Sequence, residues 1–220
     1  MKAIKKLIIP VILFTAFIVF HRSIQHNVLE LGASWTFSSL SPYILQFVTA
    51  ILLAAQISLL FKSKGRLISR LIFFLGILAF NGIAFAFNPV YEGDYSNTYK
   101  ELSLMSNQEP IFKEGLTMVA MPGCPHCYAR IGTLNKLKER KPKLDIYVKF
   151  VKNDSLAIAD YQERLSEGIS VGVARNPKFV VEVISGRFPA FLHQSKDAKT
   201  LYWEQKNFGN PALDWLEDTE

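Results

Sequence analysis

Three long apolar stretches occupy most of the first 90 residues. They run over residues 7–20, 43–61 and 71–87, and none contains a charged residue. A helix that crosses a bilayer needs about 20 mostly apolar residues, so the second and third stretches are long enough. Basic side chains that flank the shorter first stretch can reach the interface and lengthen it. The pattern therefore predicts an all-α membrane region, residues 1–90, with three transmembrane helices at about 7–24, 43–61 and 70–88.

The first and third stretches each have an alternative interpretation. A cleaved signal peptide also has a basic start and a short apolar core, but no small-x-small cleavage pattern follows residue 20. This favours an uncleaved signal anchor. A buried helix of a soluble domain is the alternative for residues 71–87, but that stretch is apolar on every face, as is typical of a helix in lipid.

Basic residues orient these predicted spans. Three lysines precede the first span and four basic residues lie between the second and third, whereas residues 21–42 hold one arginine and one glutamate. Because lysine and arginine mark cytoplasmic loops, the N-terminus and the loop at 62–70 are predicted to face the cytoplasm. The chain is then a multi-pass protein of the inner (cytoplasmic) membrane, with its C-terminal part in the periplasm or an equivalent extracytoplasmic space. Removal of the first span would leave that location unchanged.

After residue 90 the pattern changes to short alternating segments. Residues 91–110 are polar and rich in turn formers, which predicts a linker, and residues 111–220 are long enough for one domain. The order β-α-β-α-α-β-β-α predicts a mixed central sheet flanked by helices, an α/β domain. The predicted strands are 116–121, 144–151, 190–194 and 200–204, and the predicted helices are 124–140, 156–167, 177–185 and 211–217.

Charge also separates the two regions. Residues 1–90 hold 8 Lys and Arg against one acid, and residues 91–220 hold 17 against 18. A nucleic-acid-binding domain needs a basic soluble surface, so the net charge of +6 does not indicate nucleic acid as a partner. The cores of the predicted spans lack charged, histidine and cysteine side chains, which excludes an ion path or a thiol relay through them. Their predicted role is anchoring in membrane lipid or docking to a partner.

Both cysteines of the chain lie in one motif, Cys124-Pro125-His126-Cys127, where a predicted strand meets a predicted helix. At a helix start the unpaired N–H groups and the helix dipole favour the thiolate of Cys124. Pro125 suits the first turn, and His126 can add positive charge. Cys127, one turn later, is placed to attack a mixed disulfide on Cys124. The motif therefore predicts a redox-active pair.

A static disulfide or half of a zinc site would use the same two cysteines. Zinc needs four ligands, and the other histidines are His21 and His26 at the membrane and His193 in the domain, so no metal is predicted. A bridge over two intervening residues closes too short a loop to add much stability. No cofactor is predicted other than the Cys124–Cys127 disulfide itself.

The Cys124–Cys127 motif, followed by Tyr128, resembles the active site of the thioredoxin-fold periplasmic Dsb disulfide oxidoreductases. That family has a cis-proline beside the redox pair at the start of a later strand, and the segment around Pro189 is the matching position. The resemblance covers residues 112–218. It implies a thioredoxin-like domain, a cis peptide bond before Pro189, and backbone pairing of Phe188 with an extended substrate peptide.

Two positions depart from the family pattern. Met118 stands where the family commonly has a buried acidic proton acceptor, so proton transfer from Cys127 must use another group. Phe188 precedes the proline where the family usually has threonine or valine, which predicts a narrower or more apolar substrate groove. The family resemblance gives no account of the three membrane spans.

The resemblance implies an enzyme, a membrane-anchored protein thiol:disulfide oxidoreductase that acts on extracytoplasmic protein thiols. Stabilisation of the Cys124 thiolate by His126 favours the oxidising direction. A separate redox partner protein is expected, because the spans hold no thiol. Two alternatives stay open. One is a reductase or isomerase of the same fold, and the other is a non-catalytic subunit of a membrane complex that uses the fold to bind peptides.

Overall fold

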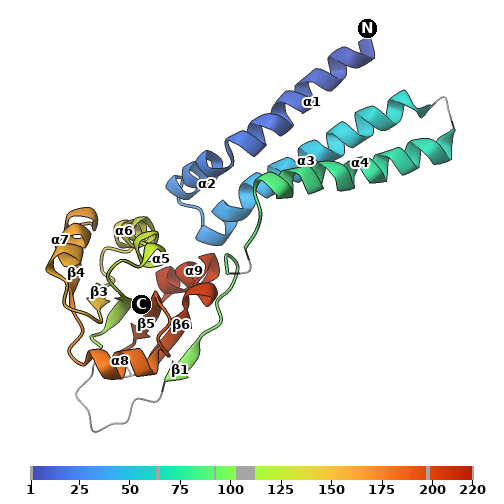
Figure 1. The fold of residues 1–220 in the computed structure, drawn as a ribbon. Helices are drawn as coiled ribbons and strands as arrows, with labels where there is room; N and C mark the ends of the chain where they lie inside the picture. Colours follow the sequence, from blue (N-terminus) through green and yellow to red (C-terminus); the bar gives the residue numbers. More distant parts are fainter. Residues whose placement is uncertain (1, 63–64, 92, 103–111, 197–198, 220) are drawn as a thin grey trace. The chain divides into compact units, whose positions relative to one another are not determined.

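The computed structural model of the chain describes residues 2–62, 65–91, 93–102, 112–196 and 199–219. The chain divides into two compact units, Met1–Tyr91 and Glu92–Glu220. In the described residues the first unit consists of helices and the second is built around a β-sheet, as Figure 1 shows.

The helical unit contains α1 (Lys2–Val19), α2 (His21–Glu30), α3 (Trp35–Leu60) and α4 (Arg66–Phe87). α3 and α4 are each long and apolar enough to cross a membrane. The first predicted span was expected to continue as one helix to about residue 24, but the chain bends by 74° between α1 and α2. By length and composition, two of the described helices could therefore cross a membrane, and a third span would require the bent pair to act as one.

Polar side chains lie at the bend between α1 and α2. Gln46 of α3 donates a hydrogen bond to the Phe17 carbonyl (3.0 Å) and lies 3.2 Å from Nδ1 of His21. Gln25 of α2 donates to the Ser39 carbonyl (3.2 Å). Because buried polar groups need hydrogen-bond partners, these contacts draw the polar start of α2 against α3 and give the bend a physical cause.

Small residues let α3 and α4 approach closely. A Cβ atom added to Gly76 of α4 would lie only 3.0 Å from Cβ of Ala54 of α3. Nearby, Phe14 of α1 packs edge-on against Phe80 of α4, with 5.5 Å between the ring centroids. Close packing of this kind is the main attraction between helices in lipid, where burial of apolar surface contributes little.

The second unit is built on a six-stranded mixed sheet with the order β1-β6-β5-β2-β3-β4. β2, β3 and β4 run parallel, whereas β5 is antiparallel to β2 and β6 is antiparallel to both β5 and β1. The predicted mixed sheet with helices is confirmed. The strands are β1 (Lys100–Leu102), β2 (Gly115–Ala120), β3 (Ile146–Phe150), β4 (Ile169–Val173), β5 (Ala190–Gln194) and β6 (Thr200–Glu204).

Helices lie on both faces of this sheet (Figure 1). The helix α8 (Pro177–Val183) packs Val180 against Val119 and Leu192 on one face. The other face carries α5 (Pro125–Tyr128), α6 (Ile131–Arg140), α7 (Ser155–Arg164) and α9 (Asn210–Asp218). Side chains alternate along a strand, so Val119 points to the α8 face while Met118 points to the opposite face.

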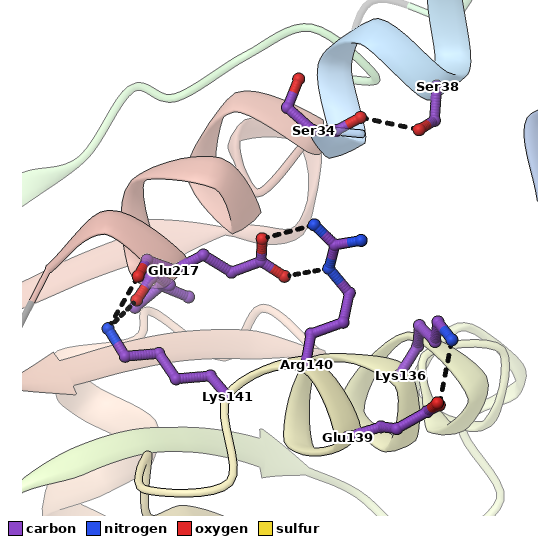
Figure 2. A network of polar contacts seen from close by, with 8 residues as sticks. Ser34, Ser38, Lys136, Glu139, Arg140, Lys141 and Glu217 are labelled. Atoms are coloured by element: carbon purple, nitrogen blue, oxygen red, sulfur yellow. Dashed lines mark hydrogen bonds and ion pairs between the residues drawn. The ribbon is translucent and has the colours of Figure 1, made fainter. Parts of the chain in front are cut away.

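The ends of α6 and α9 are joined by charged groups, as Figure 2 shows. Arg140 donates two hydrogen bonds to the Glu217 carboxylate, at 2.6 and 2.9 Å. The ammonium of Lys141 donates to the carbonyls of Leu216 (2.8 Å) and Glu217 (3.0 Å) in the last turn of α9. A cation at a helix C-terminus satisfies carbonyls that have no partner within the helix and interacts favourably with the dipole.

Two edge strands were not predicted. β1 falls within residues 91–110, which were predicted to be a linker, and part of that linker (103–110) lies outside the described residues. β4 lies between two predicted helices and contains Ser170 and Gly172. An edge strand is specified by its pairing with a neighbour rather than by a buried apolar run, so neither segment has a strong strand pattern. The predicted helix 124–140 is also interrupted, at Ala129 and Arg130.

Candidate redox site

The two cysteines form a disulfide at the turn from β2 to α5, with their Cα atoms 5.3 Å apart. Cys124 is the N-cap of α5, and its Sγ accepts a hydrogen bond from the backbone N–H of Cys127 (3.2 Å). Pro125 occupies the first turn of the helix, where its missing N–H costs nothing. His126 follows it with an exposed side chain.

The two sulfur-bearing residues differ in exposure. Cys127 is completely buried, whereas Cys124 is partly exposed. A thiolate is disfavoured in an apolar interior and favoured by a hydrogen-bond donor, so this asymmetry favours Cys124 as the residue that carries negative charge when the pair is reduced.

The length of the helix changes the expected source of that stabilisation. The sequence predicted one helix over 124–140, but α5 is a single turn of four residues that ends before α6 begins. The dipole of so short a helix is small, because the macrodipole is a sum over aligned peptide units. The N–H of Cys127 that already contacts Cys124 Sγ is therefore the specific backbone donor at this site.

The turn that leads into the motif depends on Gly123. Its φ is +73°, a conformation that residues with a Cβ adopt at a cost, and a Cβ there would meet no atom within 4 Å. Backbone conformation, and not lack of space, therefore requires glycine before Cys124.

A cavity of about 410 Å³ lies beside Cys124. Its walls come from the cysteine turn and from one face of α7, namely Gly123, Cys124, Pro125, Tyr128, Ala157, Asp160 and Tyr161. Sequence reasoning did not identify the α7 residues as part of a site. Their separations of three and four residues place them on one helix face, which is the only signal in the sequence that points to them.

Aromatic rings hold α7 against the cysteine turn. Tyr161 packs edge-on against Tyr128 (5.7 Å between centroids) and against Phe150 of β3 (5.0 Å). The Arg164 guanidinium lies 5.0 Å from the Tyr128 ring centroid and donates to Asp160 (2.8 Å). Burial raises the pKa of Tyr161 to about 12, so this phenol stays protonated at neutral pH.

The peptide bond between Phe188 and Pro189 is cis, as predicted. β5 starts at the next residue, Ala190, which pairs with Val119 near the end of β2. Because the cysteine turn follows β2, register places Pro189 and the turn at the same end of two adjacent strands. The Phe188 side chain packs against the core on the α8 face and does not line the cavity beside Cys124, and its effect on the width or polarity of a substrate groove stays a prediction.

Met118 is completely buried on β2, between Val148 of β3 and Phe191 of β5. The position where the family that the cysteine motif resembles commonly has an acid is therefore apolar in its surroundings as well as in its side chain. Asp160 is the carboxylate that lines the cavity beside Cys124, and Arg164 neutralises it.

An ion pair holds the segment that precedes Pro189. Glu204 of β6 accepts hydrogen bonds from Arg187 and from Lys100 of β1 (3.3 Å). Burial of Glu204 by itself raises its pKa, but the hydrogen bonds from the two cations lower it by more, so the pKa lies below its ordinary value. Since the folded pKa is depressed, this contribution to stability is present at neutral pH and is lost as the pH falls through that lowered pKa.

Replacement of Glu204 by glutamine is expected to destabilise the second unit at neutral pH by about 1 kcal/mol, a modest value because both cations are largely exposed. Thermal unfolding of the full chain should show this loss shrinking as the pH falls below about 4, where the wild type is protonated too. Glu167→Gln, at an exposed position, is the matched control. A destabilisation that stays constant through the acid range would contradict the ion-pair explanation.

Among the residues that the structure describes, no group of three or more His, Cys, Asp or Glu side chains is placed to hold a metal ion. Comparison of the chain with protein families, with curated proteins and with solved structures gives no match.

Proposed function

We propose that the chain is a membrane-anchored protein thiol:disulfide oxidoreductase with a thioredoxin-like redox domain outside the cytoplasm. The observation that carries this proposal is the Cys124–Cys127 disulfide at a strand-to-helix turn, with one partly exposed and one buried cysteine. The cavity beside Cys124 and the segment before Pro189 support it, since they offer space and backbone for a substrate peptide next to the sulfur.

In the oxidising direction a substrate thiolate attacks Sγ of Cys124, and the sulfur of Cys127 leaves with the electron pair of the broken bond. Burial disfavours charge on Cys127, so it takes up a proton. A second substrate thiolate then attacks the substrate sulfur of the mixed disulfide and releases Cys124 as a thiolate. Two electrons pass from the substrate to the cysteine pair, and a separate redox partner must remove them before the next cycle.

The proposal is tested by turnover of a dithiol peptide with the purified full-length protein in a neutral detergent. The wild type should form the peptide disulfide with repeated turnover when an external oxidant is supplied, and Cys124→Ser should not. A wild-type protein that binds the peptide without oxidising or reducing it would overturn the enzyme proposal and favour a non-catalytic peptide-binding subunit.

The direction of electron flow is expected to be oxidising, because the N–H of Cys127 contacts Cys124 Sγ and favours the thiolate of the reduced form, to which the neighbouring His126 can add. The reduction potential of the pair, measured against a glutathione buffer, should lie nearer to the strong oxidants than to thioredoxin. His126→Ser should lower it, with wild-type thermal unfolding. A potential near that of thioredoxin would make the protein a reductase.

The C-terminal unit is expected outside the cytoplasm. Four basic residues lie between the apolar parts of α3 and α4, so that loop should be cytoplasmic and the end of α4 should be on the other side, whatever α1 does. A reporter fused after Glu220 that is active only outside the cytoplasm should work. Activity of a cytoplasm-only reporter at the same position would contradict this topology.

A further inference from the structure

A second cavity, of about 440 Å³, lies on the α8 face of the sheet, the face opposite the cysteine turn. It arises because α8 is only seven residues long and packs over β2 and β5, where Val180 meets Val119 and Leu192. Tyr147 and Lys149 of β3, on the same face of the sheet, line the cavity. The size is within the range of cavities that bind small molecules, about 300–1,000 Å³.

Positive charge dominates the polar part of this lining. Four cationic side chains line the cavity and come from four separate segments of the chain, with Glu114 as the one carboxylate among the lining residues. The apolar part is formed by Phe112, Val173, Ala174 and Val180. The cationic residues are Lys113, Lys149, Arg175 and Lys196. This combination of an apolar wall with convergent cations is complementary to an organic anion.

Lys149 is central to this arrangement. It lies half-buried on β3, with its Nζ 5.8 Å from the Tyr147 ring centroid, and Nζ of Lys113 lies 5.9 Å from the same centroid. Gly172 of β4 lies beside Lys149, since a Cβ atom added there would be in ordinary contact with Nζ of Lys149, at 3.7 Å. Burial lowers the pKa of Lys149, and the charges of Lys113 and Arg175 lower it further. Like charges brought together in this way are stabilised when an anion lies between them.

We propose that this cavity binds a small organic anion, with its phosphate or carboxylate group held by Lys149 and Lys113 and its apolar part against Val173 and Val180. The side chains of β2, β3 and β5 alternate between the two faces, so this site is separate from the cysteine turn and from the proposed redox reaction.

Isothermal titration calorimetry of the full chain in a neutral detergent, with phenyl phosphate as the probe, tests the proposal. The wild type should bind phenyl phosphate, and Lys149→Gln and Lys113→Gln should each weaken binding about tenfold or more. Lys178→Gln removes an exposed lysine of α8 that does not line the cavity and should leave binding unchanged. Lys113 is exposed, so its replacement tests the site without threatening the fold.

Three further probes define the chemistry of the ligand. Benzyl alcohol has the same ring without the charge and should not bind, and inorganic phosphate should bind more weakly than phenyl phosphate because it lacks the apolar part. Dihexanoylphosphatidylglycerol, a short-chain anionic lipid, tests whether the natural ligand is a lipid head group. Tighter binding of this lipid than of phenyl phosphate would indicate a lipid head group, and weaker binding would indicate a soluble anion. Absence of phenyl phosphate binding to the wild type, equal binding of benzyl alcohol, or unchanged binding to both lysine variants would overturn the proposal.

Discussion

Replacing Cys127 with alanine is expected to trap substrate proteins on Cys124 as mixed disulfides. In this variant the Cys124 thiolate attacks a substrate disulfide, forms the mixed disulfide and releases a substrate thiolate. On the proposed mechanism the wild type should resolve such a species by attack from Cys127, whose backbone N lies 3.2 Å from Cys124 Sγ. Because a neighbouring thiol held in position reacts far faster than one in solution, loss of Cys127 should lengthen the life of the mixed disulfide by at least about 100-fold.

The measurement is the fraction of protein in mixed disulfides, by non-reducing electrophoresis and mass spectrometry of cells that express the full chain. Cys124→Ala and the double alanine variant are the matched controls, and neither should capture substrates. Alkylation of the reduced wild type as a function of pH provides an independent check, since Cys124 should react faster and at lower pH. A faster reaction at Cys127 would reverse the proposed roles and overturn the mechanism.

The largest expected loss of stability in the second unit comes from replacing Trp203 with alanine. Trp203 of β6 is completely buried, and its ring lies 5.6 Å from Tyr99, 5.8 Å from Phe208 and 5.7 Å from Trp215 between centroids. Its indole N–H donates to the Asn97 side chain (2.9 Å). Removing this side chain leaves a cavity and an unpaired acceptor, so we expect a cost of about 3–5 kcal/mol.

Hydrogen exchange of the full chain in detergent measures this effect locally. Backbone amides of β5 and β6 should exchange about 150- to 5,000-fold faster in Trp203→Ala, which is the factor by which a loss of about 3–5 kcal/mol raises the population of the open state. Trp203→Phe keeps most ring contacts and loses the hydrogen bond, so it should cost less. Leu156→Ala, at a position that is 83% exposed on α7, should change exchange little. Equal protection of these amides from exchange in Trp203→Ala and in the wild type would contradict the assignment of Trp203 and the rings around it as the core near β6.

Several elements of the second unit could be predicted because their patterns are local. β5 and β6 have the predicted bounds, and α9 lies within one residue of its predicted bounds. Each of these combines buried apolar positions with turn formers at its ends, so neighbouring residues specify it. β1 and β4 could not be predicted in this way, because Glu101 and Ser170 are exposed and each strand is held by pairing along one edge.

At the candidate site, too, some features could be read from the sequence and others could not. The sequence alone indicated which side chains form the disulfide, because both cysteines stand in one four-residue motif. The α7 wall beside Cys124, the packing of Phe188 toward the α8 face and the gathering of Lys113, Lys149 and Arg175 were decided only by tertiary structure.

The membrane region follows the same rule. Its apolar stretches were recognisable because a bilayer selects residues by composition over a length that a single segment provides. The bend after α1 was not recognisable, because α2 is held there by contacts of His21 with Gln46 and of Gln25 with the Ser39 carbonyl, both on α3. Composition and periodicity thus determined which segments are apolar and where the cysteine motif stands. Contacts between residues far apart in the chain decided which faces of these segments meet, because packing and strand pairing depend on partners that a local pattern does not contain.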